Sequence, residues 1–264
     1  MLDLKDIHKT FNPGTINEKV ALNGVNLHLN EGDFVTVIGG NGAGKSTMLN
    51  AVAGAWPVDT GKNIIGGTDV TKLSEYKRAA YLGRVFQDPM TGTAATMGIE
   101  ENLALAKRRG KSRLLRPGIT RQEREEYHEL LKILGLGLED RLTSKVGLLS
   151  GGQRQALTLL MATLKKPQLL LLDEHTAALD PKTAAKVLEI TDMIVNRDHL
   201  TTLMITHNMK DAIVHGNRLI MMNNGKVILD ISGEEKKKLT VKDLLDKFEE
   251  ASGEEFSNDS ALLS

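Results

Sequence analysis

Residues 39–47 read GGNGAGKST and follow directly on the apolar run FVTVI at 34–38. That run is almost continuously apolar, which is typical of a strand buried on both faces of a parallel sheet. After the glycines, apolar residues recur at helical spacing as far as Gly54, a typical helix end: Met48, Leu49, Val52 and Ala53. A strand therefore passes into a helix through a loop with few side chains, which implies that something comes very close to the backbone there.

This loop matches the pattern G-x-x-x-x-G-K-[ST] of a phosphate-binding loop, or P-loop. Without side chains, the loop can curl so that successive backbone N–H groups point at one anion, and the following helix adds the partial positive charge of its N-terminus. We expect Lys45 to reach the β- and γ-phosphates of a nucleotide, Ser46 to ligate Mg²⁺ and Thr47 to support a phosphate oxygen. A glycine-rich turn that matches by chance is the alternative, but the required strand and helix flank this one. The predicted phosphate-binding set is Gly39, Asn41, Gly42, Ala43, Gly44, Lys45, Ser46 and Thr47.

Two acids end another buried strand, in the stretch LLLLDE at 169–174. The carboxyl ends of parallel strands are where such sheets usually bind ligands. Adjacent strand residues point opposite ways, so we expect different roles: Asp173 to hold Mg²⁺, usually through water, and Glu174 to orient and polarise an attacking water. A helix N-cap followed by a surface acid is the structural alternative. The P-loop upstream favours the catalytic interpretation.

Composition narrows the classes of function. The chain has 264 residues, no cysteine, and 34 basic against 34 acidic residues, which give a formal net charge of zero. A broadly basic nucleic-acid footprint is therefore not expected, and disulfides and thiolate metal sites are excluded. No apolar run approaches the ~20 residues of a membrane helix, and the charged N-terminus is not a signal peptide. We expect a soluble protein whose membrane role, if any, works through a partner.

The coarse pattern divides the chain. Partial alternation in the first 30 residues predicts antiparallel strands, and residues from about 98 to 165 show mainly helical patterns. Buried strands then return, Asn-Gly at 224–225 predicts a hairpin, and a helix is expected at 240–250, where Thr240 and Asp243 can cap it. We predict one domain at 1–232, with an α/β core at 1–87 and 166–232 and a helical subdomain at 88–165, followed by a C-terminal helix and polar tail at 233–264.

The stretch LSGGQRQ at 149–155 is decisive through its context, because alone it could be an ordinary helix cap. The order along the chain is P-loop, Gln87 in VFQDP, LSGGQ, LLLLDE, Asp180 in AALD and His207 in MITH. This series resembles the ATP-binding-cassette (ABC) ATPases, specifically the nucleotide-binding subunits of ABC transporters, over about residues 2–232. The resemblance implies a P-loop NTPase (RecA-like) α/β core with an antiparallel β subdomain and an inserted α-helical subdomain.

The resemblance also implies roles for residues. The signature turn, here meaning Ser150, Gly151, Gly152 and Gln153, would bind the γ-phosphate of ATP held by the P-loop of a second copy, and Asp180 would connect the two sites. Gln87 would sense Mg²⁺ and the attacking water, and His207 would contact the γ-phosphate. A satisfied strand-end histidine is the structural alternative for His207. Phe11 is the candidate for stacking on adenine, with a core role as its alternative, and Val20 for packing against the ribose or base.

Three weaker signals remain. Residue 175 is His where the family usually has proline; we interpret it as a subgroup feature without a catalytic role. The stretch DPMTGTAATMG at 88–98 fits a groove for a short helix of a membrane subunit, or else a mobile surface loop. The basic run at 107–116 is a solvated loop or, as a minority interpretation, a contact with anionic headgroups or an acidic permease surface.

The expected function is an ATP-hydrolysing motor for a bacterial importer of an amino-acid-like solute, with ATP and Mg²⁺ as cofactors. Implied partners are a membrane permease, a second copy of the chain and an extracytoplasmic solute-binding protein, with the chain cytoplasmic and peripheral on the inner face of the membrane. Alternatives are an exporter or lipoprotein-extraction ATPase, a soluble ABC protein acting on DNA or ribosomes, and a regulator that binds nucleotide without hydrolysis. The zero net charge and the absence of a coiled-coil insertion or second cassette disfavour the nucleic-acid class.

Overall fold

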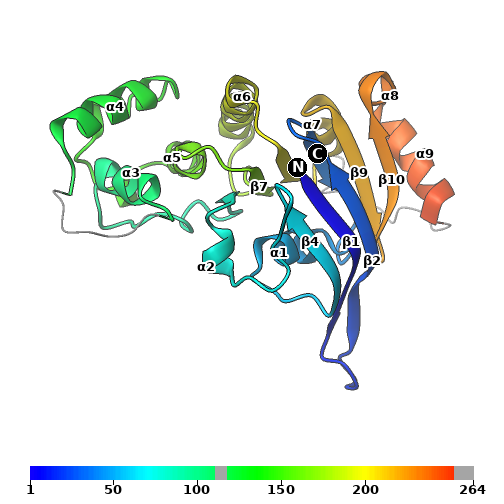
Figure 1. Ribbon diagram of the computed structural model, residues 1–264. Coiled ribbons are helices and arrows are strands. Elements are labelled where there is room, and N and C mark those ends of the chain that lie inside the picture. The colour runs from blue at the N-terminus through cyan, green and yellow to red at the C-terminus, as the bar shows by residue number, and fades with distance from the viewer. Residues whose placement is uncertain (111–117, 253–264) are drawn as a thin grey trace.

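The computed structural model describes residues 1–110 and 118–252 (Figure 1). The strands are β1 (Leu2–Phe11), β2 (Lys19–Leu29), β3 (Phe34–Ile38), β4 (Thr60–Ile65), β5 (Thr68–Asp69), β6 (Leu82–Val85), β7 (Leu169–Asp173), β8 (Thr202–Ile205), β9 (Arg218–Asn223) and β10 (Lys226–Ser232). The helices are α1 (Lys45–Ala53), α2 (Glu75–Arg78), α3 (Ile99–Lys107), α4 (Arg121–Lys132), α5 (Gly151–Thr163), α6 (Pro181–Asp198), α7 (Met209–Val214), α8 (Gly233–Lys238) and α9 (Val241–Ser252).

A six-stranded sheet of order β10-β9-β3-β8-β7-β6 forms the centre. Its neighbours pair in parallel from β9 to β6, and only β10 is antiparallel to its neighbour. β3 is buried along its whole length, as the apolar run predicted. Because parallel strands end at one edge, the loops after β3, β7 and β8 meet there, and these loops carry the P-loop, the two acids and His207.

The predicted antiparallel subdomain is confirmed as a four-stranded sheet of order β2-β1-β4-β5. It shares one hydrophobic core with α1 and the central sheet, in which Leu4 and Leu27 belong to the antiparallel sheet, Met48 to α1 and Leu171 to β7. This packing holds β1 and β2 beside the P-loop helix.

The inserted helical part is also confirmed. Between β6 and β7 the described residues form helices, turns and an isolated β-bridge, and Figure 1 shows α3, α4 and α5 gathered on the side away from β10. The opposite face of the central sheet packs there, where Leu170 and Leu172 of β7 join Leu157 of α5 and Ile194 of α6.

The C-terminal region follows the prediction in part. The hairpin between β9 and β10 turns at Asn224 and Gly225, with φ of 48° and 72°, and Thr240 and Asp243 form the predicted cap, with the Asp243 amide donating to the Thr240 hydroxyl at 3.2 Å. The basic run predicted at 107–116 falls partly outside the described residues. Helix α8 was not predicted from the sequence.

Candidate nucleotide-binding and catalytic site

A cavity of about 280 Å³ lies where the antiparallel sheet meets the P-loop. Phe11, Lys19 and Ala21 come from β1 and β2, Glu174 from the end of β7, and the rest from the loop and the start of α1: Asn41, Gly42, Ala43, Gly44, Lys45, Ser46 and Thr47. The loop that opened the sequence therefore curves around a concave space bounded by residues far apart in the chain.

The glycines of this loop serve the protein's own backbone as well as any ligand. A Cβ on Gly39 would overlap the carbonyl oxygen of Met222, and one on Gly44 would lie 2.6 Å from the carbonyl oxygen of Ala21. Both have positive φ, 149° and 102°, which favours glycine. A Cβ on Gly40 would meet nothing within 4 Å. We expected all of this space to serve a ligand, but at positions 39 and 44 it is required by the backbones of β9 and β2.

Lys45 lies against its own loop. Its Nζ donates to the carbonyl oxygens of Gly39 at 2.6 Å and Gly40 at 3.1 Å. Burial lowers the pKa of Lys45, while the charges of Glu174 and Asp173 act to raise it. A desolvated ammonium beside two acids is suited to interact strongly with an anion in the cavity.

Glu174 and His207 lie at the ends of neighbouring strands. Glu174 follows β7 with φ of 44°, a left-handed conformation that is uncommon for a residue other than glycine. Its Oε2 lies 3.8 Å from Nδ1 of His207, which follows β8. Strained backbone of this kind is common at functional sites, and Glu174 is one of the residues that line the cavity.

Asp173 is aimed differently from Glu174. Burial raises the pKa of Asp173 most, Arg84 and Lys45 lower it, and Glu174 raises it further. Asp173 lines a second cavity of about 440 Å³ together with Gln87, whereas Ser46 lines the first. The structure thus divides the three predicted metal ligands between two cavities.

These three residues offer a carboxylate, an amide and a hydroxyl oxygen, which suit Mg²⁺. In the part of the chain that the structure describes, no cluster of three or more His, Cys, Asp or Glu could hold a metal. The three oxygen donors of Ser46, Gln87 and Asp173 therefore fit an ion that takes its remaining ligands from phosphate and water.

The signature turn lies at the start of α5. The Ser150 hydroxyl accepts from the Gln153 amide at 3.3 Å, and the Gln153 side chain accepts from the Ser150 amide at 3.2 Å. Asp180 caps α6 in the same way, accepting from the Thr183 amide at 3.1 Å. None of the residues at 150–153 or Asp180 lines either cavity.

Phe11 and Val20 differ in placement. The Phe11 ring lines the cavity and packs edge-on to Trp56, with ring centres 5.1 Å apart. Val20 is 50% exposed and does not line it. Lys19 lines the cavity in its place and was missed by the sequence analysis, although a cation directly before Val20 is visible there.

His175 is buried and turned away from the nucleotide cavity. Its Nε2 lies 3.0 Å from the Thr191 hydroxyl, which donates to the carbonyl of Val187 at 2.8 Å. Because that hydroxyl has one hydrogen, Nε2 must be the donor to it. Burial, with a smaller effect of His215, lowers the pKa of His175 to about 4.

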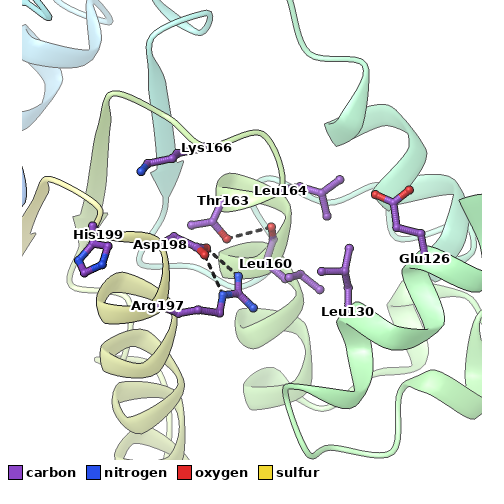
Figure 2. Close-up of a pocket in the computed structure, with 9 residues that line it drawn as sticks. All are labelled: Glu126, Leu130, Leu160, Thr163, Leu164, Lys166, Arg197, Asp198 and His199. Atoms are coloured by element: carbon purple, nitrogen blue, oxygen red, sulfur yellow. Dashed lines mark hydrogen bonds and ion pairs between the residues drawn. The ribbon is translucent and has the colours of Figure 1, made fainter.

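A further cavity of about 460 Å³ lies between α4, α5 and α6 (Figure 2). Figure 2 shows Lys166 and His199 at one end and Glu126 at the other, with Arg197 and Asp198 paired between them. Lys166 and His199 precede β7 and β8, so this cavity lies at the edge of the sheet opposite the P-loop. This cavity is larger than the one at the P-loop, but it contains none of the P-loop residues, so we do not assign the nucleotide to it.

Comparison with known proteins agrees with this geometry. The family model described as ABC transporter matches residues 22–177. The chain is 45% identical to a tyrosine transport ATP-binding protein of Clostridioides difficile, over 95% of this chain and 100% of the relative. It is 35% identical to a methionine import ATP-binding protein of Rhizobium etli, over 79% of this chain but 56% of that relative.

A solved dimeric ATP-binding cassette in a post-hydrolysis state, bound to ADP and Pi, is 30% identical and superimposes with a TM-score of 0.74, covering 88% of this chain and 98% of that one. Among the described residues, no helix combines the length and apolar character needed to cross a bilayer. Cassettes of this family bind ATP, dimerise and work with membrane permease subunits. The chain belongs to the ABC transporter family, as an ATP-hydrolysing subunit.

Proposed function

We propose that this chain powers the import of an amino-acid-like solute, with an aromatic amino acid such as tyrosine as the first candidate. The observation that carries the proposal is the 45% identity to a tyrosine transport ATP-binding protein along the full length of that relative. The chain would act on the cytoplasmic face, attached to a permease and served by an extracytoplasmic solute-binding protein.

The proposed chemistry is transfer of the γ-phosphoryl group to water. Phe11 stacks on the adenine, and the P-loop amides with Lys45 hold the phosphates. Glu174 orients and polarises the attacking water, and His207, beside it, contacts the γ-phosphate. Ser46, Gln87 and Asp173 would hold Mg²⁺, which when bound would supply positive charge to neutralise the phosphates. Catalysis then rests on positioning and electrostatics.

A second copy completes the site. The signature turn at 150–153 offers backbone N–H groups at the N-terminus of α5, a helix of 13 residues. The amides of Ser150 and Gln153 are bonded within the turn, so we assign the amides of Gly151 and Gly152 to the ATP of a facing copy. Asp180 lies at the interface between the copies. ATP closes the dimer, and hydrolysis reopens it.

Hydrolysis is tested with the Glu174→Gln variant of the full chain. We expect phosphate release to disappear while ATP-dependent dimerisation, followed by size-exclusion chromatography with light scattering, persists. A variant that still releases phosphate at the wild-type rate would contradict the role of Glu174. ATP binding without any hydrolysis in the wild type would instead support a purely regulatory protein.

The solute is tested in proteoliposomes that hold the chain with its cognate permease, identified by co-purification. We expect ATP hydrolysis to rise when the cognate solute-binding protein carries tyrosine, and to rise less with methionine or spermidine. Stimulation by spermidine alone would overturn the amino-acid assignment, and stimulation from the opposite face would indicate export.

A further inference from the structure

Arg84 is a charged residue within the short strand β6, whose other residues are leucine, glycine and valine. Arg84 pairs with Leu171 of β7, and side chains alternate along a strand, so Arg84 shares a face with Asp173. Its side chain is only 14% exposed. The sequence analysis did not identify it.

The Arg84 guanidinium touches three different elements. One of its terminal nitrogens donates to Oδ1 of Asn50 on α1 at 2.7 Å and lies 3.4 Å from Oδ2 of Asp173 on β7. Its Cζ lies 4.5 Å from the ring centre of Phe86, the residue before Gln87. Asn50 in turn donates to the carbonyl of Ser46 at 2.8 Å. Arg84 therefore contacts Asp173 directly and contacts a neighbour of each of the other two proposed ligands: Asn50, which bonds the main-chain carbonyl of Ser46, and Phe86, which precedes Gln87 in the chain.

Ordinary stability does not explain this arginine. Its Nε is buried without a hydrogen-bond partner, which is unfavourable, and an apolar residue would suit the strand better. A cation beside Asp173 also opposes a second cation there. Its favourable contacts are the hydrogen bond to Asn50, the ion pair with Asp173 and the ring contact with Phe86, and each of them ends on or beside a proposed metal ligand.

We propose that Arg84 is a positioning residue that fixes Ser46, Gln87 and Asp173 in a single arrangement for a divalent cation. This rests on the proposed function, because it takes those three residues as the ligands. Partners that orient metal ligands typically change metal affinity by about 10–100-fold when removed.

The test measures Mn²⁺, an oxygen-seeking substitute for Mg²⁺, on the full chain with ADP. Free Mn²⁺ is followed by electron paramagnetic resonance, and ADP affinity is measured separately in EDTA. For Arg84→Met we expect Mn²⁺ to bind about 10-fold more weakly, with metal-free ADP affinity within about twofold. Arg84→Lys keeps the charge but loses the planar guanidinium that lies over the Phe86 ring, so it should not restore Mn²⁺ binding fully.

Two further variants separate positioning from folding. Asn50→Ala breaks the link to Ser46 and should also weaken Mn²⁺ binding, which keeps the test usable if Arg84→Met fails to fold. Arg109→Met removes another largely buried guanidinium, which donates at 3.2 Å to the carbonyls of Ala162 and Lys165. It should lower the melting temperature without changing Mn²⁺ affinity.

Unchanged or tighter Mn²⁺ binding in folded Arg84→Met would overturn the proposal, and if that variant does not fold, unchanged binding in Asn50→Ala would overturn it. Asp173→Asn distinguishes a wrong role for Arg84 from a wrong choice of metal ligands. If Asp173→Asn weakens Mn²⁺ binding and Arg84→Met does not, positioning by Arg84 is wrong while the metal site stands. If Asp173→Asn also has no effect, the proposed metal ligands themselves are wrong.

Discussion

Nδ1 of His207 lies 3.8 Å from Oε2 of Glu174, across the ends of two neighbouring parallel strands. The register of β7 and β8 sets this relationship, because Asp173 pairs with Ile205, and each strand leaves the sheet at the same edge. A carboxylate and an imidazole so placed can hold one water between them and a phosphate.

Removing the histidine should therefore affect chemistry more than binding. For His207→Ala we expect ATP hydrolysis to fall by about 10²–10⁴-fold, with ATP affinity changed by only a few fold. Steady-state phosphate release and fluorescent-nucleotide titration measure the two effects. A large loss of affinity at an unchanged rate would assign His207 to ground-state binding instead.

Phe11 should contribute to nucleotide affinity through its ring face. We expect Phe11→Ala to weaken ATP binding by roughly 5–150-fold, the range for losing one base–aromatic stack, and Phe11→Tyr to retain it. Trp56→Ala is the matched control, because it removes the edge-on partner at 5.1 Å but not the ring itself. Equal losses of affinity in Phe11→Ala and Trp56→Ala would favour a core role.

Substitution of the two adjacent glycines Gly39 and Gly40 should affect the stability of the fold differently. A Cβ on Gly39 would overlap the Met222 carbonyl, whereas one on Gly40 meets nothing within 4 Å. We expect Gly39→Ala to lower the free energy of unfolding in urea by about 1–3 kcal/mol or more, and Gly40→Ala to change it by less than about 0.5 kcal/mol. Similar effects at both positions would show that β9 does not constrain the loop.

His175 should make stability depend on pH. Its pKa is lowered from 6.5 to about 4 in the folded chain, so between these values the unfolded chain binds more protons. Stability is therefore complete above about pH 6.5 and falls as the pH drops towards 4. Between pH 6.5 and 5, this group should remove about 2 kcal/mol from the free energy of unfolding.

Urea unfolding at both pH values checks this effect. In His175→Gln the loss between them should be smaller than in the wild type by about that amount. His128→Gln, which removes a partly exposed histidine on α4, should leave the loss unchanged. An identical pH dependence in wild type and His175→Gln would mean that the imidazole is not buried as described.

The packing of α9 against β3, α7 and β9 should contribute strongly to the free energy of unfolding. Leu244 is fully buried in a cluster with Ile38, Met209 and Met221. Leu244→Ala should cost about 2–5 kcal/mol, and Asp246→Ala, on the exposed side of α9, less than about 0.5 kcal/mol. Chemical unfolding measures both. A small effect of Leu244→Ala would mean that the helix is only loosely attached.

Much of the fold was predictable because its signals are local. Short apolar runs predict the buried strands β3 and β7, and an Asn-Gly pair predicts the hairpin at Asn224. Helix α8 was not predictable, since GEEKKK has no apolar face. It is held in place partly by Lys236, which donates to the carbonyls of His215 and Gly216, contacts that a local pattern does not encode.

The site divides in the same way. Lys45 could be placed at the cavity from the residue spacing of the P-loop pattern. Glu174 could be placed there because it follows the end of a buried strand. Arg84 was missed, because its partner Asp173 is 89 residues away in the chain and the meaning of a charge in a strand depends on what faces it. Val20 was expected at the cavity, yet Lys19 lines it, since the choice between adjacent residues depends on strand register.

Gly39 and Gly44 rest on carbonyls of β9 and β2, so the curvature of the loop is settled when the chain folds. A loop that is already shaped in this way loses little conformational freedom when a triphosphate arrives. Nucleotide binding should accordingly be rapid, with a small loss of entropy. The slower, ordering step of the cycle should be the association of two copies of the chain.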